Sequence, residues 1–281
     1  MSQALHAKQA IVRPSPHPAR TVMRDAVHAE WTKLRTVAST GWLLLGVIAA
    51  TVALSSAAAA ALTCTSSAGC HPDITKVSLT GVDLGQAVVA IVAVLAVSGE
   101  YGTGMIRTTL AAVPRRTTVL AAKAAVVTCA VLAASTIAVL GSVLAGQLVL
   151  PGHGFTPAHG YPALSLADAT VLRAAVGSVL YLALIALLSL GIATAVRDSA
   201  AAIGVVLGLL YLFPIVASVV SDATLARRLQ QIGPLSAGLD VQATTGVKAL
   251  PLTPWQGLGV VALWTAGALL LGVLALKFRD A

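Results

Sequence analysis

The sequence predicts an all-α membrane protein that crosses the bilayer six times. Its 281 residues are 57% hydrophobic and only 10% charged, whereas soluble domains usually carry about 25% charged residues. The mean hydropathy is +0.90. A transmembrane helix needs about 20 mostly apolar residues, because each residue advances about 1.5 Å through a hydrocarbon core about 30 Å thick. Six segments satisfy this requirement, so we expect both termini on one side of the membrane.

The apolar segments are separated by turns and loops that hold most of the charged and turn-forming residues. The predicted spans are, in order, Trp42–Leu62, Leu79–Ser98, Ala124–Leu150, Leu172–Val196, Ala200–Val220 and Trp255–Leu276. The third span is long enough to tilt in the bilayer. Pro214 is expected to kink the fifth span, because proline lacks an N–H group for the helical hydrogen bonds. Residues 221–254 predict short helices at the outer interface, and residues 39–281 are expected to form one transmembrane domain.

Two further segments precede the first span. Residues 1–20 combine several prolines and charges with no apolar core, which predicts a flexible cytoplasmic tail rather than a signal peptide. Residues 21–38 place apolar side chains and Trp31 at helical spacing. They are predicted to form an amphipathic helix in the membrane interface, with the tryptophan at headgroup depth. Within this helix, Glu30 and Lys33 are expected to form a weak surface ion pair.

The basic residues predict the orientation of the chain. Lys and Arg are retained on the cytoplasmic side, whereas acidic residues have little influence. The N-terminal segment, residues 99–123, the turn 197–199 and the C-terminal tail hold thirteen of the eighteen basic residues. We therefore expect cytoplasmic termini and a multi-pass protein of the bacterial cytoplasmic membrane. The net charge of +8 mostly reflects this topology, and no nucleic-acid partner is expected.

Two cysteines lie in the first outer loop. Cys64 and Cys70 flank the run TSSAG, and an oxidising compartment would let them form a short disulfide. The sequence is equally consistent with two free thiols. A metal site formed by these cysteines and His71 is conceivable, but a fourth ligand is not evident, so we expect no bound metal.

The loop between the second and third spans carries an unusual number of charges. It reads GEYGTGMIRTTLAAVPRRTTVLAAK over residues 99–123. Its glycines interrupt the second span where it leaves the membrane, and a short amphipathic turn precedes Pro114. This pattern predicts a short helix and an elbow exposed to the cytosol. The glycines do not form a nucleotide-binding fingerprint, because they follow a membrane helix, and the chain contains no P-loop motif.

Two stretches resemble the ABC-2 type permeases, the membrane subunits of a class of ATP-binding-cassette exporters. The first is HAEWTKLRTVAST, which is similar to the interfacial connecting helix of that family. The second is GEYGTGMIRTTLAAVPRR…VLAAK, which resembles the loop that carries the coupling helix. The resemblance implies a non-enzymatic permease subunit that binds no cofactor itself, because ATP and Mg²⁺ are bound by a separate ATPase.

The resemblance also implies roles for individual loop residues. Those expected to form or flank the element that docks in a groove of the ATPase are Glu100, Tyr101, Gly102, Thr103, Arg107, Thr108, Thr109 and Leu110. Those expected to guide the chain back into the membrane are Pro114, Arg115 and Lys123. The implied assembly contains two ATPase copies and a second permease, either identical or homologous, surrounded by membrane lipid.

Other six-span proteins fit the sequence less well. A secondary transporter would usually place acidic residues or broken helices near the midplane, whereas Asp83 and Asp168 lie near the outer ends. An intramembrane serine protease needs a buried histidine, and all six histidines lie outside the predicted spans. A membrane metalloprotease needs His-Glu-x-x-His, which is absent. The alternative that remains is a non-transport subunit that acts in signalling or antibiotic immunity.

Overall fold

The computed structural model describes residues 19–64, 70–102, 104–105 and 116–278. Every regular element within these ranges is a helix, and six of the helical segments are long and apolar enough to cross a membrane. The spanning helices are α2 (Ala38–Ala61), α4 (Val82–Gly102), α6 (Arg116–Val149), α7 (Ala169–Val196), α8 (Ser199–Val219) and α11 (Pro254–Phe278). The predicted all-helical, six-span architecture is confirmed, although the third span begins two turns before its predicted start.

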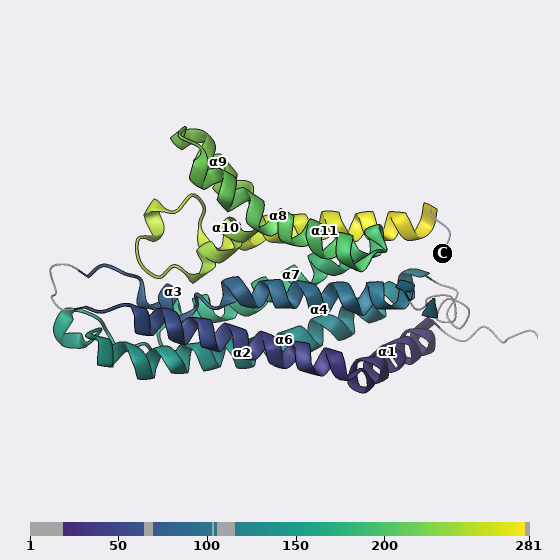
Figure 1. Ribbon diagram of the computed structural model, residues 1–281, viewed down its shortest axis with the longest axis horizontal. Coiled ribbons are helices and arrows are strands. Elements are labelled where there is room, and N and C mark those ends of the chain that lie inside the picture. Colours follow the sequence, from purple (N-terminus) through teal and green to yellow (C-terminus); the bar gives the residue numbers. More distant parts are fainter. Residues whose placement is uncertain (1–18, 65–69, 103, 106–115, 279–281) are drawn as a thin grey trace, which may run out of the picture.

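The predicted amphipathic helix corresponds to α1 (Ala19–Thr36). Figure 1 places α1 at the same end of the bundle as the C-terminal end of α11. Ala26 of α1 is buried, and α1 packs against α6. Trp31 is 43% exposed, and its position at headgroup depth stays a prediction. The end of the bundle that contains α1 is called the α1 end below.

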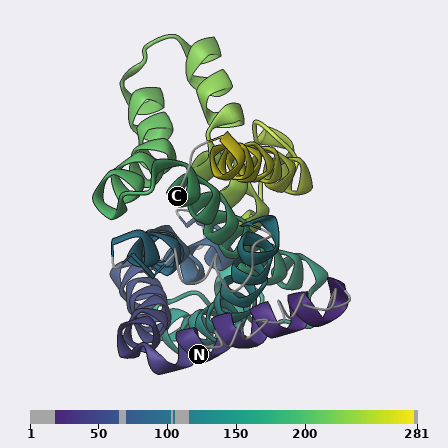
Figure 2. The same ribbon diagram turned by 90° about the vertical axis from the view of Figure 1, so that its right-hand side faces the viewer.

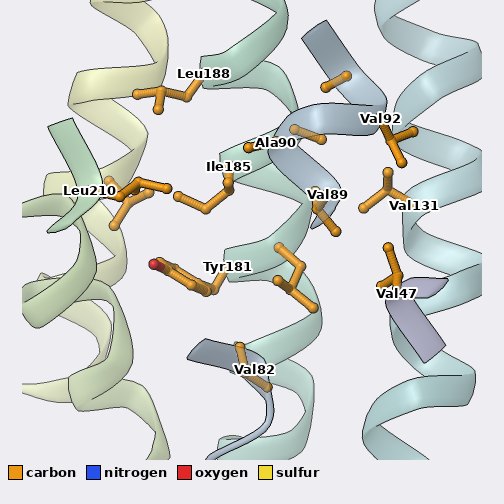
Figure 3. Close-up of a cluster of buried hydrophobic side chains, with 14 of the residues drawn as sticks. Val47, Val82, Val89, Ala90, Val92, Val131, Tyr181, Ile185, Leu188 and Leu210 are labelled. Atoms are coloured by element: carbon orange, nitrogen blue, oxygen red, sulfur yellow. The ribbon is translucent and has the colours of Figure 1, made fainter. Parts of the chain in front are cut away.

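Helix α7 forms the centre of the bundle. Tyr181, Ile185 and Leu188 on this helix are fully buried, and Figure 3 shows side chains from α2, α4, α6 and α8 converging around them. Close packing is the main attraction between helices in lipid, where burial of apolar surface contributes little. Gly191 shows how close the helices come, because a Cβ atom there would lie 2.5 Å from the backbone of Ala268 on α11.

Helix α8 continues through Pro214. After α8 the chain turns back and forms several short helices. The short elements are α9 (Ala223–Ile232), α10 (Pro234–Leu239), η3 (Asp240–Gln242) and η4 (Val247–Ala249). Short helices in this segment are as predicted. Figures 1 and 2 show that α9 projects from the side of the bundle opposite α1 and α2.

The end of the bundle opposite the α1 end contains a disulfide and a carboxylate that links two of its segments. Cys64 and Cys70 are joined by a disulfide in the structure. Asp73 caps α3 (Ile74–Ser78) and also accepts hydrogen bonds from Thr244 and Thr245. Burial alone would raise the pKa of Asp73, but these hydrogen bonds hold it below its ordinary value. The Asp73 carboxylate therefore ties α3 to the loop before α11.

Candidate functional site

Four charged side chains meet where α1, α4 and α6 come together at the α1 end. Lys33 Nζ lies 2.9 Å from Glu30 Oε1 and 2.7 Å from Glu100 Oε1. Lys123 Nζ lies 2.6 Å from Glu30 Oε2 and 3.0 Å from Glu100 Oε1. Each acid thus pairs with both lysines. These four residues are called the ion network below.

The ion network is largely removed from solvent. The side chains of Glu30, Glu100 and Lys123 are 6–7% exposed, and that of Lys33 is 30% exposed. Burying a charge is costly unless a partner of opposite sign lies within hydrogen-bonding distance. The two carboxylates and two ammonium groups balance one another, which makes their burial possible. Burial lowers the pKa of Lys33, but hydrogen bonds to Glu100 and Glu30 outweigh this effect and raise it above its ordinary value.

The local sequence explains how each member of the ion network is placed. Glu30 and Lys33 are three residues apart on α1 and therefore share one face of the helix. Glu100 stands in the last turn of α4, and Lys123 lies two turns into α6. The predicted pair between Glu30 and Lys33 is present, but it is not a surface pair, because Glu30 is buried and both residues pair with α4 or α6 as well.

A cavity of about 360 Å³ lies beside the ion network. Lys33, Glu100 and Lys123 line one part of it, and apolar side chains such as Val92 and Val127 line the rest. No group of three or more His, Cys, Asp or Glu residues suited to a metal ion occurs in the described part of the chain. The cavity and the network therefore provide paired charges and apolar surface rather than the groups of a metal centre.

The base of the loop between α4 and α6 is tied to two further helices. The guanidinium of Arg197 lies 5.5 Å from the centre of the Tyr101 ring and donates a hydrogen bond to the carbonyl of Ala275 on α11. Arg116 donates to the carbonyl of Leu276, also on α11. Both arginines thus satisfy carbonyl groups at the C-terminal end of α11, where positive charge is favourable. Tyr101, just before the loop, is thus linked to α11 through Arg197. Arg116, just after the loop, is bonded to α11 directly.

The structure describes only part of the predicted docking loop. Glu100, Tyr101 and Gly102 form the last residues of α4. The loop residues that lie outside the described ranges are Thr103, Arg107, Thr108, Thr109, Leu110, Pro114 and Arg115. The structure thus brings Glu30, Lys33, Glu100 and Lys123 together. Trp31 forms none of these ion pairs, and the disulfide lies at the opposite end of the bundle.

A second polar cluster within the spans was not anticipated from the sequence. The hydroxyl of Tyr181 donates to Gln86 Oε1, and Gln86 Nε2 lies 3.3 Å from the hydroxyl of Tyr211. That hydroxyl in turn donates to the backbone carbonyl of Asp83 at 2.6 Å. These bonds join α4, α7 and α8. A lone glutamine in an apolar segment could have indicated such a cluster, since a buried amide requires partners.

Asp240, in η3, is a buried acid that belongs to neither cluster. Burial raises its pKa to about 6, and the more distant charge of Lys76 only partly opposes this effect. Asp240 therefore titrates near neutral pH.

Comparisons with known proteins give no independent guide to function. No model of a known protein family matches the chain, and no curated protein matches it.

Proposed function

We propose that this protein is the permease subunit of an ATP-binding-cassette exporter of the ABC-2 type, which moves a substrate across the cytoplasmic membrane with energy from a separate ATPase. The ion network is the observation that carries this proposal. All four of its members come from the two stretches that resemble permease motifs, 28–40 and 99–123. Two stretches separated by two spans, α2 and α4, and the outer loop between them thus meet through ion pairs that are largely buried.

The burial of the network supports a mechanical role. Replacing a buried ion pair with apolar residues is often neutral or stabilising, so such pairs are weak evidence for stability alone. Buried ion pairs can instead fix how helices are aligned, because a shift of one helix would leave a buried charge without its partner. We infer that the network holds α1, the end of α4 and the start of α6 in one fixed arrangement around the loop.

The mechanism follows from this arrangement. ATP binding closes the two ATPase subunits, and the docking loop of each permease moves with them. Because the loop begins at Glu100 and returns before Lys123, its displacement is passed to α1, α4 and α6 as a rigid-body movement. The Arg116 and Arg197 contacts extend the movement to α11. A path between the two permeases then opens to the outside.

Glu100 acts beneath the docking surface in this mechanism. Its side chain is 6% exposed, so it positions the loop through its lysine partners and does not present its carboxylate to the ATPase. The residues expected to contact the ATPase directly are those that follow it, Arg107 to Leu110.

Site-specific photocrosslinking in native membranes tests the proposal. A photoreactive amino acid at Thr109 should crosslink to a protein with the motifs of an ATP-binding-cassette ATPase. The same amino acid at Gly152 is the control, because Gly152 is exposed at the opposite end of the bundle. If no ATPase is captured at Thr109, or if it is captured equally at Gly152, the exporter proposal fails and the non-transport alternative is favoured.

A further inference from the structure

A long apolar groove runs along the side of the bundle between α8 and α11. These two helices both pack on α7, but their backbones do not come close to each other along most of their length. The groove has a volume of about 780 Å³ and is lined by apolar side chains of α7, α8 and α11, with Gln231 of α9 at its edge. Because its three walls are membrane-spanning helices, the groove opens into the hydrocarbon of the bilayer.

The groove is closed at the end that lies under α9. The indole N–H of Trp264 on α11 donates to the carbonyl of Ile232 at 2.9 Å. The Trp264 ring also packs edge-to-face against Phe213 of α8, with the ring centres 6.2 Å apart. These contacts bridge the two walls, and the amide of Gln231 is satisfied by the carbonyl of Pro251. The groove therefore has a closed apolar end.

The other end of the groove reaches the α1 end of the bundle, where basic residues gather. Val196 lines the groove, and Arg197 follows it directly. Lys277 is exposed at the end of α11, and Arg197 donates to the carbonyl of Ala275 on the same helix. Asp198 is the acid beside them, and its carboxylate caps α8 by accepting from the Ala201 N–H. The groove thus combines an apolar, closed interior with a basic mouth.

The length of the groove is similar to the depth of one leaflet. The wall formed by α11 extends from Val260 to Leu271, which is about 16 Å at about 1.5 Å per residue. One leaflet of the hydrocarbon core is about 15 Å deep.

We propose that this groove binds an anionic phospholipid from the leaflet at the α1 end, with acyl chain between α8 and α11 and its phosphate beside Lys277 and Arg197. Anionic headgroups attract basic residues at the membrane surface, and the closed end sets the direction in which the chain enters. The site does not depend on ATP or on a partner subunit, so it is independent of the exporter proposal.

Two glycines of α11 provide matched variants. A Cβ atom at Gly267 or at Gly259 would meet no other atom within 4 Å, so each position tolerates a larger side chain. Gly267 lines the groove, whereas Gly259 lines a separate apolar depression of about 400 Å³ between α6, α7 and α11. Gly267→Trp should fill the groove, and Gly259→Trp adds the same side chain to the same helix elsewhere.

Native mass spectrometry of the detergent-purified chain, with added phosphatidylglycerol or phosphatidylcholine of identical chains, tests the site. The unaltered protein should retain one phosphatidylglycerol per chain, and Gly267→Trp should reduce this bound fraction at least fivefold while Gly259→Trp leaves it unchanged. Lys277→Gln should weaken phosphatidylglycerol binding to the level of phosphatidylcholine. Equal retention by both tryptophan variants would overturn the proposal. So would a Gly267→Trp variant that loses a second copy of the chain and keeps its lipid, because the groove would then be an interface between copies.

Discussion

The substitution Glu100→Gln tests whether the ion network behaves as one unit. It keeps the shape of the side chain and removes its charge. Oε1 of Glu100 contacts both Lys33 and Lys123, so the three remaining members carry two positive charges and one negative charge. Removing one partner of a buried ion pair costs about 3–5 kcal/mol. We expect a loss of about 3 kcal/mol in the free energy of unfolding, because Glu30 still pairs with both lysines.

A second substitution should recover part of this loss. Lys123→Met alone leaves an uncompensated carboxylate, but in the Glu100→Gln background it restores charge balance and leaves the Glu30–Lys33 pair intact. The double variant should therefore be about 1–3 kcal/mol more stable than the sum of the single effects predicts. Asp25→Asn is the control. Asp25 is exposed on α1, so its loss should change the stability by less than about 0.5 kcal/mol.

Equilibrium unfolding in mixed micelles, followed by helical circular dichroism during titration with sodium dodecyl sulfate, measures all four stabilities. Strictly additive effects of Glu100→Gln and Lys123→Met would refute the idea of a coupled network. If Glu100→Gln changed the free energy of unfolding as little as Asp25→Asn does, the Glu100 carboxylate could not be a buried, paired charge.

Three further outcomes are expected. A cysteine at Gly152 should react with a membrane-impermeant thiol reagent from outside intact cells, and one at Thr117 should not; the reverse pattern would invert the topology. The folded pKa of Asp240, about 6, lies above its ordinary value of 3.8, so the folded state binds this proton more tightly and stability falls as the pH rises from about 4 to 6. Asp240→Asn should therefore stabilise the protein by about 3 kcal/mol at pH 7.5 and leave it nearly unchanged near pH 4. Equal effects at both pH values in thermal unfolding would contradict this sign. Gly191→Ala should cost about 1–3 kcal/mol, because its Cβ would overlap the α11 backbone, whereas Gly204→Ala, which meets nothing within 4 Å, should cost nothing; equal melting temperatures would argue against the close α7–α11 contact.

The spanning helices could be predicted because lipid imposes one simple requirement. Every backbone polar group in the bilayer needs a partner, so a long apolar segment has to be a helix. This requirement determines how many spans the chain has, but it does not determine the residue at which each span begins or ends. The pattern predicts a helix that follows Arg116 and continues into the third span, but it places the start of the span itself at Ala124, whereas the long helix α6 begins at Arg116. The side chains of Arg116 and Lys123 are both paired within the bundle.

The ion network was recognised only in part from the sequence. The sequence draws attention to all four members, but it presents Glu30 and Lys33 as a local surface pair and Glu100 and Lys123 as separate loop residues. Spacing along one helix says nothing of a partner 67 or 93 residues away. A signal was present nonetheless. Glu100 and Lys123 stand at the ends of otherwise apolar segments, where a buried charge has to find a partner of opposite sign. The groove between α8 and α11 could not be foreseen, because it arises from the packing of helices and from no residue pattern.

Affinity purification of the tagged protein from its native membrane in mild detergent tests the exporter proposal most directly. We expect an ATP-binding-cassette ATPase to be recovered in equal amount with the chain, to be lost in Arg107→Glu and to be retained in Asp25→Asn. A chain recovered without any ATPase, at native abundance and with its membrane helices intact, would contradict the proposal, because the permease would then lack its source of energy.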